Sequence, residues 1–215
     1  VRPPRSRPRT PAPALGEKKR FWAATALLEG DPEQTEDAEA LVADIAYKLD
    51  GILHDQEPGR LVVLFGLPAA DEHDAVSTIR FAIESQDAVG HMRAAPGAER
   101  SIPRESQVQL RIGVRTGTAR MGGHPSEEGY QLLGNTLAEC LALARATPPG
   151  QTCLAGLAAR LASEHFVLRE GRALRRHGKP VRTYRVLAPR TRTSRGGGSA
   201  EFALPLVGRD VERSE

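Results

Sequence analysis

The chain of 215 residues is 40% hydrophobic, enough for one ordinary domain with tails, and none of its apolar runs reaches the roughly 20 residues needed to cross a bilayer. Its formal net charge of +3 comes from one end, because the first 20 residues carry seven Lys or Arg and one Glu, which leaves the remainder net acidic. The composition therefore argues against a membrane-spanning protein and against a nucleic-acid-binding domain.

Both ends of the chain are predicted to lie outside the folded domain. Residues 1–19 are rich in proline and arginine and have almost nothing to bury, which predicts a disordered linker. Residues 189–203 contain the run RGGGSA and predict a second, flexible linker. Since the first residue is Val rather than Met, we expect the sequence to be an excerpt of a longer protein.

Strands and helices alternate in the first half of the expected domain. The apolar stretch at residues 20–28 predicts a strand, and an Asp-Pro pair then opens a helix predicted over residues 32–54. A compact apolar run at residues 60–66 predicts a central strand. Residues 71–94 have apolar residues at helical spacing and predict a second helix.

Residues 107–145 are predicted to form a strand, a glycine turn, a second extended piece and a helix. The turn is placed at Gly113 and Gly117, where the backbone must bend or approach another group closely. The helix follows Gly134, with the next Asn or Thr as its N-cap. A short strand and a short helix are expected within residues 151–162.

The last part of the domain, residues 165–187, alternates apolar and polar residues on either side of glycines and predicts a terminal hairpin. The complete order of elements is β-α-β, then α-β-β-α-β, then the hairpin. This order predicts an α+β fold, in which a mostly antiparallel, ferredoxin-like sheet carries helices on one face.

Three parts of the chain, taken together, resemble the catalytic domain of the class III adenylate and guanylate cyclases. They read LVVLFGLPAADEHDAVSTIRFAIESQ, then LRIGVRTGTARMGG with YQLLGNTLAECLALA, and finally HGKPVRTYRVL. That family has an F-G-x-P strand end, a G-I-x-x-G strand, a Y-x-x-x-G helix entry and a closing K-G…Y segment. The residues that keep this order are Phe65 to Pro68, Gly113 with Gly117, Tyr130 with Gly134, and Gly178 with Tyr184. The resemblance covers residues 20–188.

The resemblance implies a metal-dependent cyclisation of a nucleoside triphosphate, in which two aspartates hold the metal ions. In this chain the corresponding positions carry Leu27, near the end of the first strand, and Arg60, before the FG strand. Glu29 and Asp31 lie two and four residues beyond the first position. We therefore expect no metal site of the family's kind.

The resemblance also implies an Asn and an Arg that stabilise the transition state from the helix after the glycine. The corresponding positions are Ala138 and Ala142, and His177 stands where the family has a base-recognising lysine, with Lys179 close by. Alanine can neither hydrogen-bond a ribose nor neutralise a phosphate. Because the family builds one site from two subunits, and both contributions are lost here, we interpret the domain as a pseudo-cyclase without catalytic residues or cofactor.

Glycines and helix starts that once surrounded a nucleotide can still bind an anion through backbone amides. The candidates for such residual nucleotide or anion contacts are Gly66, Gly117, Gly134, Asn135 and Thr136.

Other polar clusters are interpreted as structural. The acidic residues around His73 are assigned to the first turn of a helix rather than to a metal site, and His124 to a polar loop. The basic run at residues 175–182 is assigned to a solvated hairpin. Cys140 and Cys153 have no metal-ligand spacing, which indicates reduced thiols in the cytoplasm.

Residues 204–215 contain PLVGRDVE and resemble the entry to an AAA- or STAND-type ATPase domain. The preferred hypothesis is a non-catalytic regulatory module of a multidomain signalling protein, acting as a homodimer or docked on flanking ATPase or kinase domains, with a nucleotide as its candidate ligand and no nucleic-acid or membrane partner. The first alternative is an active cyclase that uses Glu29, Asp31 or Asn135. The second is a nucleic-acid module, for which only Phe65 offers a stacking aromatic on the central strands.

Overall fold

The computed structural model describes residues 16–94, 107–122, 129–176 and 179–190. The strands are β1 (Lys18–Glu29), β2 (Ile52–Glu57), β3 (Arg60–Phe65), β4 (Gln109–Met121), β5 (Tyr130–Leu133), β6 (Gln151–Ala155), β7 (Phe166–Glu170), β8 (Leu174–Arg176), β9 (Lys179–Val181) and β10 (Thr183–Pro189). The helices are α1 (Pro32–Lys48), α2 (Asp74–Ala94), α3 (Thr136–Ala146) and α4 (Leu157–Ala162).

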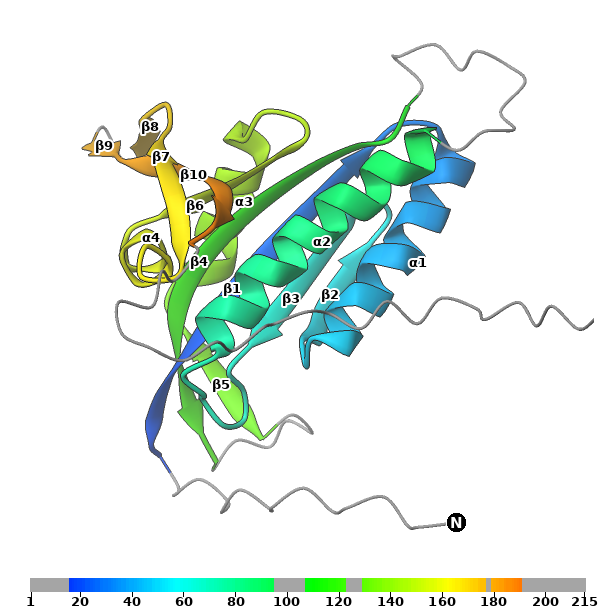
Figure 1. Cartoon of the computed structure of the whole chain (residues 1–215). Coiled ribbons are helices and arrows are strands. Elements are labelled where there is room, and N and C mark those ends of the chain that lie inside the picture. The colour runs from blue at the N-terminus through cyan, green and yellow to red at the C-terminus, as the bar shows by residue number, and fades with distance from the viewer. Residues whose placement is uncertain (1–15, 95–106, 123–128, 177–178, 191–215) are drawn as a thin grey trace, which may run out of the picture.

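One large sheet organises these elements (Figure 1). Its strand order is β2-β3-β1-β4-β6-β10-β7, and β5 pairs with the end of β4. All neighbouring strands are antiparallel except β4 and β6, which run parallel. Strands β8 and β9 form a separate small hairpin. The expected α+β fold with a mostly antiparallel sheet is therefore confirmed. The segment predicted as one terminal hairpin forms two antiparallel pairs, β7–β10 within the main sheet and β8–β9 outside it.

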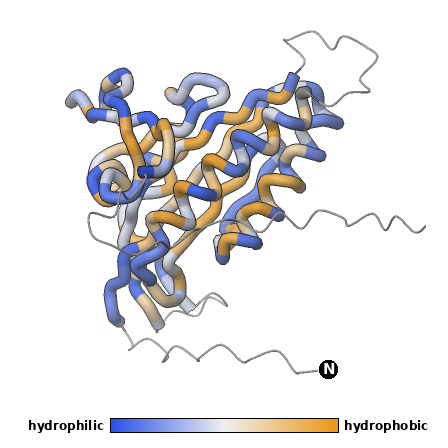
Figure 2. The backbone as a smooth tube through the Cα atoms, in the orientation of Figure 1, coloured by the Kyte–Doolittle hydropathy of each residue, from blue (hydrophilic) through white to orange (hydrophobic). Residues whose placement is uncertain are grey.

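The two faces of the sheet bury different cores. Along β1, Trp22 and Ala24 point to the face covered by α1, α2 and α4. Phe21 and Ala23 point to the opposite face, where they meet Cys140 of α3. Since successive side chains of a strand alternate between faces, β1 contributes to both cores, and almost all of its central residues are buried. In Figure 2 the central strands are correspondingly apolar, whereas the β8–β9 hairpin is largely hydrophilic.

Helix α1 ends earlier than the sequence suggested. The prediction of one helix as far as His54 was wrong, because the helix stops at Lys48 and the chain continues as β2, the edge strand. At the junction Asp50 has a φ of +61°. A Cβ at Gly51 would lie 2.7 Å from a methyl carbon of Val63, so the chain passes directly over β3 at this point. Ile52 and Leu53 therefore belong to a strand, although they also fit the helical spacing, whereas Leu49 is the C-cap of α1.

Of the two roles expected for Gly113 and Gly117, the turn is wrong, since β4 is one continuous strand, and the close approach to another group is confirmed. Gly113 instead makes room for α3, because a Cβ there would lie 2.6 Å from both the carbonyl oxygen of Cys140 and the backbone nitrogen of Ala144. Gly117 similarly lies against the ring of Phe21 and the hydroxyl of Thr136. Both glycines thus permit close contact between a strand and the elements that cross it.

Several sequence-based predictions concern residues outside the described part of the chain. These are residues 1–15 of the predicted linker 1–19, residues 191–203 of the predicted linker 189–203, the ATPase-like residues 204–215, the loop with His124, and the pair at 177–178. The inner bounds of both linkers were wrong by one or two residues, because β1 already begins at Lys18 and β10 runs to Pro189. Within the described residues, none of the helices combines the length and apolar character needed to span a bilayer.

We expect Gly113→Ala to destabilise the domain by about 1–3 kcal/mol, because the new methyl group must displace backbone atoms of α3. The matched control is Gly90→Ala in α2, where a Cβ would meet nothing within 4 Å. That substitution should stabilise the domain by about 0.5–1 kcal/mol through helix propensity. Urea unfolding followed by circular dichroism measures both, and equal effects of the two substitutions would contradict the packing described here.

Candidate functional site

The two positions that the family resemblance assigns to metal ligands lie side by side. Leu27 of β1 and Arg60 of β3 are direct partners in the antiparallel register. The Arg60 guanidinium is bound to Asp55 at 2.6 Å and to Glu57 at 2.8 Å. A cation of the protein itself therefore occupies this place between carboxylates, and Leu27 adds no ligand atom.

A cavity of about 710 Å³ lies at the same end of the sheet but on its other face, between the end of β1, the start of α1 and the β2–β3 turn, and neither Leu27 nor Arg60 lines it. We call it the acidic cavity, because Glu29, Glu36 and Glu39 all line it. The carboxylate of Glu39 accepts a hydrogen bond from the backbone N–H of Gly59 in the turn. Carboxylates at this density repel phosphate groups, and one of them already uses an amide that could otherwise bind an anion.

The two carboxylates proposed as displaced metal ligands have other partners. Asp31 caps α1, where its Oδ1 accepts hydrogen bonds from the N–H groups of Glu33 (3.1 Å) and Gln34 (3.4 Å). Glu29 forms an ion pair with Arg111 at 3.0 Å. Across the described residues, no group of three or more His, Cys, Asp or Glu side chains is arranged to hold a metal ion.

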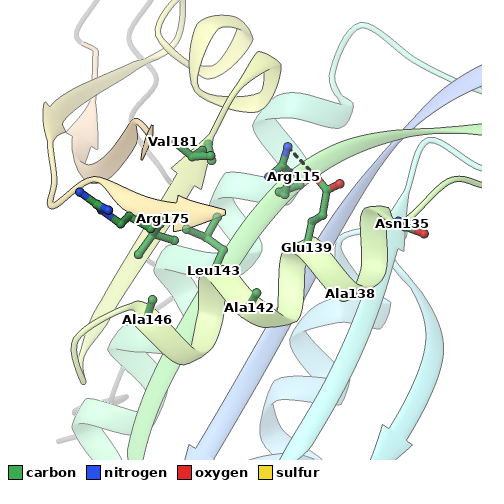
Figure 3. A pocket seen from close by; sticks show the side chains of 11 residues that line it. Arg115, Asn135, Ala138, Glu139, Ala142, Leu143, Ala146, Arg175 and Val181 are labelled. Carbon is green, nitrogen blue, oxygen red and sulfur yellow. Dashed lines mark ion pairs between the residues drawn. The ribbon is translucent and has the colours of Figure 1, made fainter. Parts of the chain in front are cut away.

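The two alanines assigned to the transition-state side lie together on α3. Ala138 and Ala142 are one helical turn apart, both are exposed, and both line a cavity of about 390 Å³ (Figure 3). We call it the α3 cavity, and its walls come from α3, β4, β6 and the β8–β9 hairpin. Asn135 also lines it; it stands at the N-cap of α3 without capping the helix through its side chain. The expected N-cap interaction of Asn135 is therefore absent.

One ion pair in the α3 cavity was not foreseen from the sequence. Arg115 of β4 and Glu139 of α3 are 2.8 Å apart, with side chains only 20% and 17% exposed (Figure 3). Charges with so little access to water are stable mainly when paired. Arg115 alternates with apolar residues of a strand, and nothing in its spacing indicates that it meets α3.

The candidates for residual anion contacts are not gathered in one place. Gly134, Asn135 and Thr136 are consecutive at the start of α3, and Gly117 lies against Thr136. Gly66 directly follows the last residue of β3, far along the strand from Arg60, and a Cβ there would lie 2.5 Å from the carboxylate of Asp74. An anion bound at Gly66 would therefore meet a negative charge.

The polar cluster around His73 forms the turn that leads into α2. Asp71 accepts hydrogen bonds from the backbone N–H and the ring Nδ1 of His73, both at 2.8 Å, and these bonds hold the pKa of Asp71 below its ordinary value. The side-chain bond to Asp71 raises the pKa of His73. Asp74 accepts from the N–H of Asp71 at 2.7 Å, while burial raises the pKa of Asp74. These contacts fit a helix start, as the sequence indicated.

Of the basic run at residues 175–182, the structure places Arg175 at the rim of the α3 cavity. The base-recognition position, His177, is outside the described residues, and so is Gly178. Lys179 opens β9, where its backbone pairs with Arg176.

With this geometry in hand, the chain can be compared with known proteins. No family sequence model matches it, and no curated protein matches it in sequence. Solved structures do. The adenylyl cyclase CyaB from P. aeruginosa superposes with a TM-score of 0.68 at 18% identity, covering 82% of this chain and 98% of that one. The guanylyl cyclase Cya2 gives 0.67 at 19% identity, covering 84% and 98%.

A third neighbour is the dimeric guanylyl cyclase domain of the RhoGC fusion protein from the aquatic fungus Blastocladiella emersonii. It gives a TM-score of 0.63 at 13% identity, covering 81% of this chain and 99% of that one. The chain has the fold of the class III nucleotide cyclases. At these identities the comparison establishes the cyclase fold, while the chemistry must be argued from the residues of this chain.

The thiols of this cyclase-fold domain are both free and buried. Cys140 lies on the side of α3 that faces the sheet, where its Sγ donates to the carbonyl oxygens of Gly113 (3.0 Å) and Ala23 (3.3 Å). Burial raises the pKa of the Cys140 thiol from 9.0 to about 11, and burial also raises the pKa of Cys153. Neither sulfur has the properties of a nucleophile at neutral pH.

We expect Cys140 in a Cys153→Ser variant to react with a disulfide reagent at pH 8 at least about 100-fold more slowly in the folded chain than in urea, because the raised pKa alone removes most of the thiolate. Release of the coloured thiolate measures both rates.

The same shift in the pKa of Cys140 has a consequence for stability. The folded state holds the proton of Cys140 more tightly than the unfolded state does. The stabilisation of the folded state that results is complete below pH 9.0 and is lost as the pH rises towards 11. The Cys140→Ala variant should lack this loss of stability at high pH. Rapid labelling of Cys140 in the folded Cys153→Ser variant would contradict its buried position.

Proposed function

We propose that this chain is a catalytically inactive cyclase-homology domain that serves as a regulatory or dimerisation module in a multidomain intracellular signalling protein. The observation that carries the proposal is the state of the four catalytic positions. The resemblance assigns them to Leu27, Arg60, Ala138 and Ala142, and none of the four is a residue able to perform the corresponding step.

On the metal side, the chemistry requires oxygen ligands that hold divalent cations next to the triphosphate. Leu27 offers none, and Arg60 carries a positive charge that is already bound by Asp55 and Glu57. A divalent cation placed there would be repelled by the guanidinium.

On the transition-state side, the chain lacks side chains that donate hydrogen bonds to the negative charge that develops during the reaction. Ala138 and Ala142 have no polar atoms beyond the backbone, and the nearby Arg115 is held by Glu139 at 2.8 Å. Loss of a single such donor costs about 10²–10³ in rate. Losing the donors together with the metals accounts for a domain without turnover.

The alternative of an active cyclase requires Glu29, Asp31 or Asn135 to take over these roles. Asp31 is engaged at the start of α1 and Glu29 with Arg111. Asn135 lines the α3 cavity, whose lining shares no residue with that of the acidic cavity. These contacts favour the non-catalytic proposal.

We expect the purified chain to form no cyclic AMP or cyclic GMP from ATP or GTP with Mg²⁺ or Mn²⁺ above a protein-free blank, since both halves of the chemistry are missing. The measurement is chromatography of the products, with a catalytically competent class III cyclase domain as the positive control. Product that disappears in Glu29→Gln or Asp31→Asn would overturn the proposal in favour of displaced ligands.

The regulatory role requires the domain to associate, either with a second copy or with flanking ATPase or kinase domains. Support comes from the fold, since the guanylyl cyclase domain of the fungal neighbour has been solved as a non-canonical dimer and also as a monomer.

Light scattering after size exclusion should therefore give a mass that rises with concentration from about the 23.2 kDa of one chain towards twice that value. A strictly monomeric chain at all concentrations would leave docking to flanking domains as the only form of the role.

A further inference from the structure

The α3 cavity has a chemical character that differs from that of a nucleotide site. Its walls are apolar, because Leu143 and Ala155 form a small buried cluster with Leu174 and Val181 packed against it. The exposed alanines of α3 complete the wall (Figure 3). A cavity of about 390 Å³ lies within the range of about 300–1,000 Å³ that holds small molecules.

The charges that line this cavity are few and unequal. Arg115 and Glu139 neutralise each other at one end. Arg175 belongs to the β8–β9 hairpin at the opposite end, where Figure 3 shows its side chain directed outward from the mouth. It is exposed, and among the described residues no ion pair involves it. The lining thus carries one uncompensated positive charge, at the mouth.

We propose that the α3 cavity binds a small organic monoanion, with its apolar body against the alanines of α3 and its anionic group at Arg175. The proposal rests on the proposed function, because the space exists where Ala138 and Ala142 stand in place of larger polar residues. It deepens that function by giving the module a ligand to sense.

The same features disfavour a nucleoside triphosphate in this cavity. A triphosphate carries several negative charges, and the described lining offers a single free cation. The one buried arginine is already held by a carboxylate. An apolar wall contributes most when it removes apolar surface from water, which a hydrocarbon or aromatic body supplies and a phosphate chain does not.

The test uses two probes of the same shape, anilinonaphthalene sulfonate and its uncharged parent, phenylnaphthylamine, titrated into the full chain by fluorescence. We expect one site per chain for each. Ala142→Trp, which fills the cavity from an exposed position, should weaken both probes by about tenfold or more. Ala40→Trp, which points into the acidic cavity from α1, should change neither by more than about twofold.

Arg175→Glu separates charge from packing. It should weaken the sulfonate by roughly five- to tenfold, as expected for reversing an exposed charge next to an anion, and should leave the uncharged probe within about twofold. If Arg175→Glu weakened the two probes equally, or if Ala142→Trp bound both probes as tightly as the original chain, the proposal would be overturned. A change in oligomeric state of Ala142→Trp with the probe still bound would overturn it as well, because the cavity would then be a protein contact.

This outcome is separable from that of the proposed function. A chain that makes no cyclic nucleotide and binds neither probe refutes the ligand site alone. A chain that makes cyclic nucleotide refutes the pseudo-cyclase assignment, whatever the probes do. Circular dichroism of each variant confirms that the fold is retained during the titrations.

Discussion

Helix α3 can lie against the sheet only because residue 113 has no side chain. The backbone of α3 approaches β4 so closely that a methyl group at Gly113 would fall within 2.6 Å of its atoms. The thiol of Cys140 closes the same contact by donating to Gly113 and Ala23. This approach fixes how the helix is rotated. With Cys140, Leu143 and Ala144 turned inward, Ala138, Ala142 and Ala146 must face outward into the α3 cavity. The site is thus a consequence of one steric constraint.

The two sides to which the cyclase resemblance assigns chemistry differ in character. On the side of β1 and β3 the charges are paired, since Arg60 binds Asp55 and Glu57, and Glu39 accepts a hydrogen bond from Gly59 in the turn. On the side of α3, exposed alanines line a largely apolar cavity. Paired charges thus dominate the first side and apolar surface the second.

The sequence predicts the fold class because period-2 and period-3.6 patterns are clear in β1, β3, α2 and α3. It fails for β2, because the apolar residues beyond position 48 continue the helical spacing, and only contact of Gly51 with β3 reveals that the helix has ended. It fails at Gly113 because a glycine that turns the chain and a glycine that admits a helix look alike in one sequence. Within the site, motif spacing pointed to Ala138 and Ala142, and both line the α3 cavity. The Arg115–Glu139 pair could not be predicted, since it joins a strand to a helix through tertiary structure alone.

The ion pairs of Arg60 limit which residues position 60 can accept. An aspartate there would place a third carboxylate beside Asp55 and Glu57, whose charges Arg60 balances. Three neighbouring carboxylates without a cation repel one another, so Arg60→Asp alone would be destabilising. A bound metal ion could offset that repulsion only with suitable ligands around it, and Leu27, the partner of Arg60 in the sheet, supplies none.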